Sequence, residues 1–263
     1  MEILKLEHAS ITYDGEHSAV EDISFSVEEG QIIGIVGESG SGKSTLLHSL
    51  VGLLPRSAGC RGTFSLFGRD LHSMTRKELL QMRGRDVAMI FQDTGRYMNP
   101  IARIGSQYTE FLQVHGIRSK QEALSMERDL LSRVHLHDAD RVLHAYPFEL
   151  SGGMRQRVGI AMAMTLKPRL LLADEPTSAL DVTVQAQVVY EMMELRRKYG
   201  TTIIVVTHNI GVAAYMSDII GVMQHGRMVE WGKTEEVINH PKEEYTRALL
   251  NSIVELNDER LTG

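Results

Sequence analysis

The sequence has 263 residues but only one cysteine, Cys60, so no disulfide can form within the chain. Such cysteine usage is typical of a reducing compartment. No uninterrupted apolar run approaches the roughly 20 residues that cross a membrane, and residues 1–14 lack a signal-peptide pattern. The net charge of −6 carries no basic excess of the kind that nucleic-acid binding needs. These absences favour a cytosolic protein. The length of 263 residues predicts one large domain with two lobes.

A glycine-rich segment with the pattern G-x-x-x-x-G-K-[S/T] begins at residue 37. The apolar residues 32–36 predict a buried strand before it, and residues 45–51 have helical leucine spacing after it. Glycines let backbone N–H groups curl around phosphates, and the helix N-terminus adds partial positive charge. We expect Lys43 to reach the β- and γ-phosphates of a nucleoside triphosphate and the Ser44 hydroxyl to ligate Mg²⁺. The predicted nucleotide-binding residues of this segment are Gly37, Glu38, Ser39, Gly40, Ser41, Gly42, Lys43, Ser44 and Thr45.

Two further apolar runs end in polar side chains. Residues 170–173 precede Asp174 and Glu175, and residues 202–206 lead to His208. Parallel strands present ligand-binding side chains at their carboxyl ends. We therefore expect Asp174 to hold Mg²⁺, directly or through water, and Glu175 to polarise the attacking water. His208 is expected near the γ-phosphate.

A signature segment and a short acidic loop complete the motifs. Leu150-Ser151-Gly152-Gly153-Met154-Arg155-Gln156-Arg157 lies before the acidic strand, and Ser178-Ala179-Leu180-Asp181 follows it. Together and in this order, the motifs resemble the ATP-binding cassette (ABC) ATPases, and the resemblance covers nearly the whole chain. It implies an α/β fold, a P-loop NTPase (RecA-like) nucleotide-binding domain with an antiparallel β subdomain and an inserted helical subdomain. It also implies ATP hydrolysis coupled to membrane transport, with ATP and Mg²⁺ as cofactors.

The same resemblance assigns roles to these two segments. The trans signature comprises Ser151, Gly152, Gly153 and Met154, and the D-loop comprises Ser178, Ala179, Leu180 and Asp181. The signature is expected to close on the γ-phosphate held by a partner subunit, offering a hydroxyl, backbone N–H groups and the positive end of a helix dipole. The alternative is that Ser151 is only an N-cap followed by flexible glycines. Met154 replaces the glutamine of many cassettes, a change that leaves the backbone donors in place.

Two predicted site residues lie outside these motifs. Residues 3–13 and 23–27 alternate like strands of a half-exposed antiparallel sheet. The resemblance implies that Tyr13 stacks on adenine, and a core tyrosine at a strand end is the alternative. Residues 87–92 predict another strand, ending at Gln92. This glutamine resembles the Q-loop residue that senses Mg²⁺ and the attacking water.

The motif positions predict how one cassette over residues 1–263 is divided. Residues 122–134 have an amphipathic helical pattern in the middle of a helix-rich stretch. The predicted parts are a RecA-like core with β subdomain at 1–92 and 167–235, a helical subdomain with the signature at 93–166, and a C-terminal tail at 236–263.

Shorter segments resemble the peptide/nickel importers within the ABC family. They are Gln92-Asp93 with Asn99-Pro100, Ala145-Tyr146-Pro147, residues 181–187, and the tail residues His240-Pro241, Tyr245-Thr246 and Leu249-Leu250. These importers use two unlike ATPase subunits. Met154, in place of glutamine in the signature, indicates that this chain resembles the first of them. The implied partners are a related second ATPase in a heterodimer, two membrane permeases and an extracytoplasmic substrate-binding protein, with this chain peripheral at the cytoplasmic face of the membrane. Residues 94–98 replace the proline that usually follows Gln-Asp, in a loop expected to border the permease.

The transported substrate stays open between peptides and nickel or a metal chelate, because the ATPase does not contact the cargo. No cysteine follows Cys60, which excludes an iron–sulfur cluster in the tail. The tail is shorter than in many peptide-type relatives, which favours nickel or a metal chelate. Non-transport ABC ATPases of DNA repair or the ribosome are the alternative class. They are disfavoured because the segment between Gln92 and Ser151 has no sustained heptads or cysteine pairs and the chain holds one cassette. No nucleic-acid partner is expected.

Overall fold

The computed structural model describes residues 1–15, 17–178 and 180–258, with side chains described as far as residue 251. The chain divides into two compact units. The first unit comprises Met1–Leu80 and Thr202–Gly263, and the second comprises Gln81–Thr201. These boundaries differ from those of the predicted core, helical subdomain and tail, and that finer division stays a prediction.

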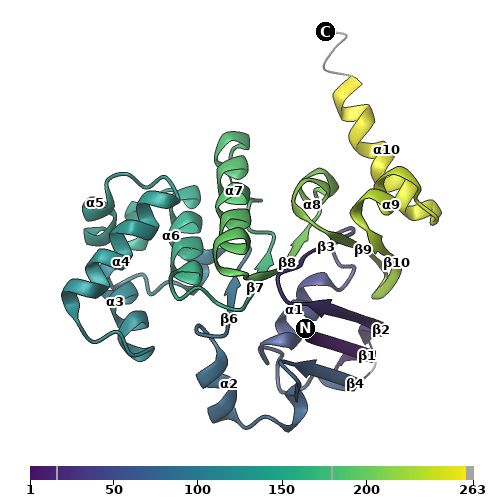
Figure 1. Ribbon diagram of the computed structural model, residues 1–263, viewed down its shortest axis with the longest axis horizontal. Coiled ribbons are helices and arrows are strands. Elements are labelled where there is room, and N and C mark those ends of the chain that lie inside the picture. The colour runs from purple at the N-terminus through teal and green to yellow at the C-terminus, as the bar shows by residue number, and fades with distance from the viewer. Residues whose placement is uncertain (16, 179, 259–263) are drawn as a thin grey trace. The chain divides into compact units, whose positions relative to one another are not determined.

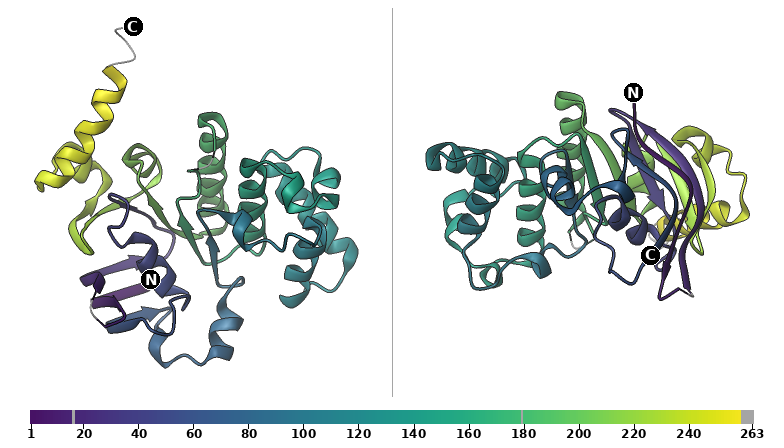
Figure 2. Two further views of the ribbon diagram at one scale, coloured as in Figure 1. Left: turned by 180° about the vertical axis from the view of Figure 1, so that it is seen from behind. Right: turned by 90° about the horizontal axis from the view of Figure 1, so that it is seen from below.

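An antiparallel sheet opens the first unit, with strand order β2-β1-β4-β5. Its strands are β1 (Glu2–Tyr13), β2 (His17–Glu28), β4 (Gly59–Leu66) and β5 (Arg69–Asp70). Leu6 of β1 pairs with Phe25 on one side and Phe64 on the other, and all three are buried. The alternation predicted for residues 3–13 is confirmed, whereas β2 extends well before residue 23 because its more polar first half also pairs with β1. Figure 2 shows these strands side by side.

A second group of strands in the first unit has the order β10-β9-β3-β8. These are β3 (Ile32–Val36), β8 (Thr202–Thr207), β9 (Ile219–Gln224) and β10 (Arg227–Lys233). β3 runs parallel to both β8 and β9, and every residue of β3 and β8 is buried, as expected for continuous apolar strands of a parallel sheet. β3 is therefore a central strand, and its carboxyl end leads into the glycine-rich loop.

The helices of the first unit follow these strands (Figure 1). They are α1 (Lys43–Leu50), η1 (Leu71–Ser73), α8 (Ile210–Met216), α9 (Thr234–Asn239) and α10 (Glu244–Asp258), while α2 (Arg76–Met82) lies across the division between the units. α1 begins two residues earlier than predicted because Gly42, its N-cap, adopts a left-handed conformation that directs the chain into the helix at Lys43. Buried residues from β3, β9, α8 and α9 form one apolar cluster in this unit.

The second unit combines a pair of parallel strands with most of the helices. The strands are β6 (Val87–Ile90) and β7 (Leu170–Asp174), and the helical elements are η2 (Thr94–Tyr97), α3 (Ile104–Val114), α4 (Lys120–Arg133), α5 (Ala139–His144), η3 (Pro147–Glu149), α6 (Gly152–Thr165) and α7 (Val182–Tyr199). The helix predicted at 122–134 is confirmed as α4, which buries Ala123, Glu127 and Leu131 at four-residue spacing. Figure 1 shows α3 to α6 gathered together.

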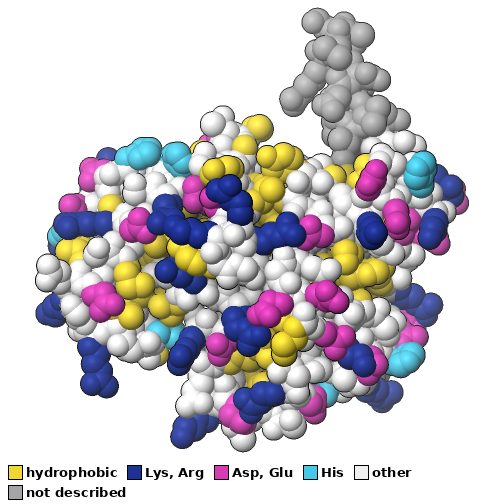
Figure 3. Space-filling model, in the orientation of Figure 1, with side chains coloured by type: hydrophobic (Ala, Val, Ile, Leu, Met, Phe, Trp, Pro, Cys, Tyr) yellow, Lys and Arg dark blue, Asp and Glu magenta, His cyan; other side chains and the backbone are white. Residues whose placement is uncertain are grey.

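The outer surface of the chain carries charges of both signs. On the face shown in Figure 3, basic and acidic side chains are interspersed, and apolar side chains lie between them. Among the described helices, none combines the length and apolar composition that crossing a bilayer requires.

Candidate functional site

The loop between β3 and α1 requires glycine at two positions. Gly37 has a φ of 151°, and a Cβ there would lie 2.1 Å from the Met223 carbonyl oxygen. Gly42 has a φ of 99°, and its Cβ would lie 2.1 Å from the carbonyl oxygen of Ala19. A larger residue at either position would displace backbone, so the two glycines set the course of the loop.

Lys43 is the cation of this loop, and its side chain is only 5% exposed. Its Nζ donates hydrogen bonds to the Gly37 carbonyl oxygen at 2.8 Å, the Glu38 carbonyl oxygen at 2.6 Å and Ser41 Oγ at 3.1 Å. A buried ammonium group surrounded by loop oxygens is a preorganised positive charge. It lies at the start of α1, where the partial positive charge of the helix N-terminus adds to it.

Tyr13 lies against the same helix start. Its Oη is 3.2 Å from Thr45 Oγ1, a hydrogen-bond distance, and the tyrosine side chain is half-buried. The end of β1 is therefore brought beside the glycine-rich loop, from a position 32 residues away in the chain. Stacking of Tyr13 on adenine stays a prediction.

His208 follows the buried strand β8, and its side chain is exposed. The neighbouring residues fix the local backbone. Thr207 Oγ1 accepts a hydrogen bond from the N–H of Asn209 at 3.0 Å, and Asn209 caps α8 by accepting from the N–H groups of Gly211 and Val212 at 3.0 and 3.2 Å. The imidazole thus projects from a well-defined turn rather than from an irregular loop.

Asp174 and Glu175 stand at the end of β7 in the second unit. All five residues of β7 are buried, and Asp174 is 4% exposed. Glu175 has a φ of 43°, a left-handed conformation that is strained for a side chain with a Cβ. Its Oε2 accepts a hydrogen bond from Gln92 Nε2 at 2.9 Å. Two predicted catalytic residues are therefore in contact.

The segment after Glu175 holds this strained conformation. The N–H and the Oγ of Ser178 both donate to the Glu175 carbonyl oxygen, at 3.2 and 3.1 Å. Asp181 then caps α7, since its Oδ1 accepts from the N–H of Val184 at 3.0 Å. Leu180 is half-buried, and Ala179 lies outside the described residues. The predicted D-loop thus includes a local support for Glu175.

The signature segment forms the beginning of α6. Ser151 is the N-cap, and its Oγ accepts a hydrogen bond from the N–H of Met154 at 3.2 Å. Ser151 and Gly152 are exposed, and Gly153 and Met154 are half-buried. Ser151 therefore caps α6, and Gly152 and Gly153 lie within the first turn of that helix. Action on a partner's nucleotide stays a prediction.

Gln156 is a residue of this segment to which the sequence assigns no role. Its side chain is 2% exposed, and its Oε1 accepts from both the N–H and the Oγ1 of Thr94, at 3.2 and 2.9 Å. Its Nε2 donates to the carbonyl oxygens of Phe91 and Pro176, at 2.9 and 3.1 Å. Phe91 and Thr94 lie before and after Gln92 in the chain. Pro176 directly follows Glu175. The sequence offers one indication of this burial. Gln156 is four residues before the apolar Ile160, a spacing that places both on the same face of a helix.

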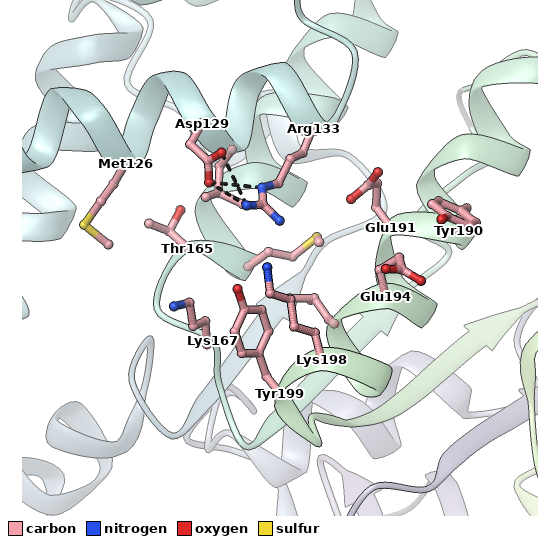
Figure 4. Close-up of a pocket in the computed structure, with 13 residues that line it drawn as sticks. Met126, Asp129, Arg133, Thr165, Lys167, Tyr190, Glu191, Glu194, Lys198 and Tyr199 are labelled. Atoms are coloured by element: carbon pink, nitrogen blue, oxygen red, sulfur yellow. Dashed lines mark hydrogen bonds and ion pairs between the residues drawn. The ribbon is translucent and has the colours of Figure 1, made fainter.

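A cavity of about 350 Å³ in the second unit is lined by none of the predicted site residues that the structure describes (Figure 4). It lies between α4, the end of α6 and α7, where Arg133 pairs with Asp129 at 3.0 Å. The Nζ atoms of Lys167 and Lys198 lie 4.6 and 5.5 Å from the centre of the Tyr199 ring. The predicted nucleotide residues are thus distinguished by motif and local geometry rather than by this cavity.

Comparison with known proteins decides the family. Residues 20–178, more than half of the chain, match the family described as ABC transporter. The chain belongs to the ABC transporter family. Residues 229–263 of this cassette also match the C-terminal region of oligopeptide/dipeptide transporters.

Relatives are similar to this cassette over nearly its whole length. The oligopeptide transport ATP-binding protein OppD of Salmonella typhimurium is 42% identical, with 98% of this chain and 77% of that protein covered. OppD of Bacillus subtilis is 41% identical, with 100% of this chain and 75% of that protein covered. The probable D,D-dipeptide transport ATP-binding protein DdpD of Escherichia coli is 42% identical, with 95% and 77% covered.

A solved cassette supports the fold assignment. The dimeric post-hydrolysis structure of the ATP-binding cassette MJ0796 with ADP and Pi has a TM-score of 0.80 and 27% identity, covering 88% of this chain and 99% of that one. The predicted fold class is confirmed as that of an ABC nucleotide-binding domain, and the cassette is an ATPase. The predicted site residues are divided between its units. Tyr13, the loop from Gly37 to Thr45 and His208 belong to the first unit, and Gln92, Asp174, Glu175, the signature and the D-loop belong to the second.

Proposed function

We propose that this ABC ATPase powers the import of peptides. The observation that carries the proposal is the match of residues 229–263 to the C-terminal region of oligopeptide/dipeptide transporters. It is supported by relatives named for oligopeptide and dipeptide transport that align with almost the whole chain. A nickel or metal-chelate substrate, which the sequence favours, is the second candidate.

Each predicted residue has a role in the proposed reaction. The loop from Gly37 to Thr45 binds the phosphates, with Lys43 supplying the positive charge. Glu175 accepts a proton from the attacking water, and Gln92, which donates to Glu175 Oε2, holds the carboxylate in position. His208 contacts the γ-phosphate and Tyr13 stacks on adenine. The strain at Glu175 is consistent with a residue held in place for catalysis.

The donor set fits Mg²⁺ bound together with ATP. Among the described residues, no group of three or more His, Cys, Asp or Glu side chains is arranged to hold a metal ion by itself. Mg²⁺ usually keeps several waters and is held by one or two carboxylates together with the phosphates of its substrate, rather than by a cage of protein ligands. The Ser44 hydroxyl, the Asp174 carboxylate and the Gln92 side-chain oxygen would be its protein ligands. When bound, the ion would neutralise charge on the β- and γ-phosphates.

Transport requires partners beyond this chain. The proposed assembly contains a related second ATPase, two membrane permeases and an extracytoplasmic substrate-binding protein, with this chain peripheral at the cytoplasmic face of the membrane. Within the ATPase pair, the exposed α6 start at Ser151 would complete the partner's nucleotide site. Closure of the ATPase pair would be transmitted to the permeases by residues 93–100, which follow Gln92.

Reconstitution of the complete transporter in proteoliposomes tests the proposal. We expect ATP hydrolysis to rise when the binding protein is loaded with an oligopeptide and to remain at its basal rate with a nickel chelate. Stimulation by the nickel chelate alone would replace the peptide proposal with the second candidate. Co-purification of the chain with DNA or ribosomes instead of permeases would contradict a role in transport.

A further inference from the structure

Tyr245, in the first turn of α10, contacts the backbone of the glycine-rich loop. The N–H of Glu38 donates a hydrogen bond to Tyr245 Oη at 3.0 Å. The two residues are 207 positions apart in the sequence, and both belong to the first unit. Tyr245 lies within the segment that matches the C-terminal region of oligopeptide/dipeptide transporters. That region thus reaches the loop that precedes Lys43.

The peptide group bound by Tyr245 is also bound by Lys43. It consists of the carbonyl of Gly37 and the N–H of Glu38, which point in opposite directions in a trans peptide. The carbonyl oxygen accepts from Lys43 Nζ at 2.8 Å, while the N–H donates to Tyr245. The plane of this peptide is therefore held from both sides, and the next carbonyl oxygen, that of Glu38, also accepts from Lys43.

Independent contacts fix the position of Tyr245. The carboxylate of Glu230 on β10 accepts hydrogen bonds from the N–H groups of Lys242 and Glu243, at 2.9 and 3.3 Å, immediately before α10 begins. Burial opposes ionisation of Glu230, but these hydrogen bonds outweigh it and hold the pKa of the carboxyl below its usual value. An anionic group at this helix start also interacts favourably with the helix dipole.

Apolar packing completes the support. Tyr245, Leu249 and Leu250 pack against the buried cluster that contains Val36, the last residue of β3. Val36 directly precedes Gly37. The same cluster therefore fixes the position of two elements: the start of the glycine-rich loop, and the helix α10 that carries the hydroxyl of Tyr245.

We propose that Tyr245 is a positioning residue for ATP binding, which orients the Gly37–Glu38 peptide and through it the ammonium group of Lys43. The inference rests on the proposed role of Lys43 in binding the phosphates. It gives the C-terminal region of this cassette a part in nucleotide affinity. Tyr245 does not touch the nucleotide, so its effect is on binding rather than on the chemical step.

Tyr245→Phe tests this inference, because it removes the hydroxyl and keeps the ring in the apolar cluster. We expect the Kd for a fluorescent ATP analogue to rise about two- to tenfold, the range that one lost hydrogen bond produces. In the assembled transporter, KM for ATP should rise while kcat stays unchanged. Tyr215→Phe, on an exposed tyrosine of α8, is the matched control and should leave both constants unchanged.

Two results separate failure of this inference from failure of the proposed function. An unchanged Kd in Tyr245→Phe, with a wild-type urea midpoint, would overturn the positioning role. If Lys43→Ala loses ATP binding in the same assay, the phosphate-binding role of the loop still stands. If Lys43→Ala binds normally, that role fails and the inference fails with it. A fall in kcat at unchanged KM would also overturn the inference.

Discussion

The side-chain amide of Gln92 donates a hydrogen bond to the Glu175 carboxylate, from Nε2 to Oε2 at 2.9 Å. The two residues follow parallel strands, β6 and β7, and lie 83 positions apart in the sequence. Gln156 supports both residues of this pair. Its Nε2 donates hydrogen bonds to the carbonyl oxygen of Phe91, the residue before Gln92, and to that of Pro176, the residue after Glu175. A residue of the signature helix thus supports both members of the proposed catalytic pair.

Glu175→Gln should retain ATP binding and slow turnover at least about tenfold, because the side chain keeps its shape but no longer accepts a proton. It should also trap an ATP-bound dimer. Turnover in the assembled transporter and equilibrium binding of a fluorescent ATP analogue measure the two effects. Glu110→Gln, on an exposed residue of α3, is the control. Near-normal turnover of Glu175→Gln would remove Glu175 as the general base.

Lys43→Ala should weaken ATP binding sharply, since it deletes a buried cation that three loop oxygens hold in place. Titration with the fluorescent analogue measures the loss, and circular dichroism confirms that the variant is folded. Lys77→Ala, at an exposed lysine of α2, should bind as the wild type does. Wild-type affinity in folded Lys43→Ala would exclude this loop from phosphate binding.

Ser151→Arg should abolish the stimulation of turnover by the partner ATPase and the permeases while sparing ATP binding by the isolated chain. The bulk would lie at the exposed start of α6, where the partner's nucleotide is proposed to dock. Ser151→Ala separates bulk from capping, because it loses the hydrogen bond to the Met154 N–H, about 1 kcal/mol of stability, without adding volume. It should reduce stimulation less than Ser151→Arg does, because it loses the hydroxyl but keeps the backbone N–H groups and the helix dipole at the start of α6. Full, transporter-like hydrolysis by a strictly monomeric wild-type chain would refute the trans site.

Gln156→Met should lower the free energy of unfolding by at least about 2 kcal/mol, because it leaves the buried N–H of Thr94 and the carbonyls of Phe91 and Pro176 without this partner. Turnover should fall as well, since Gln92 and Glu175 lose their common support. Urea unfolding and steady-state kinetics measure these effects. Gln187→Met, on the half-buried face of α7, is the control. A stable variant with normal turnover would contradict the role of Gln156.

Glu127→Gln should stabilise the protein increasingly as the pH rises above about 4. Burial raises the pKa of Glu127, against a smaller opposing effect of the hydrogen bond from Thr109 Oγ1 at 2.7 Å. The folded state therefore binds the proton more tightly than the unfolded state, and its advantage is lost as pH rises through the folded pKa. Glutamine keeps an oxygen for Thr109 and never ionises. Urea midpoints of the variant and the wild type between pH 4 and 8 should diverge, and parallel curves would contradict the assignment.

Local patterns in the sequence are sufficient for the elements whose pattern is strong. The continuous apolar runs at 32–36 and 170–173 form the buried strands β3 and β7, since a short strand covered on both faces keeps every side chain from water. The amphipathic stretch at 122–134 is α4, displaced by one or two residues because Ser119, not an apolar residue, caps the helix. By contrast, β4 was not predicted, because its first residues are polar and pair only when β1 lies beside them.

The sequence by itself determined the resemblance to the ABC ATPases and which side chains are candidates for the site, because loop glycines, the lysine and the paired acids follow one another within short segments. Only the tertiary structure decided how those side chains are held. Gln156 binds residues on two other segments, Ser178 supports the strained backbone of Glu175, and Tyr245 binds Glu38 across 207 positions. Contacts between distant segments depend on where packing places each backbone, and a pattern read along one segment does not contain that information.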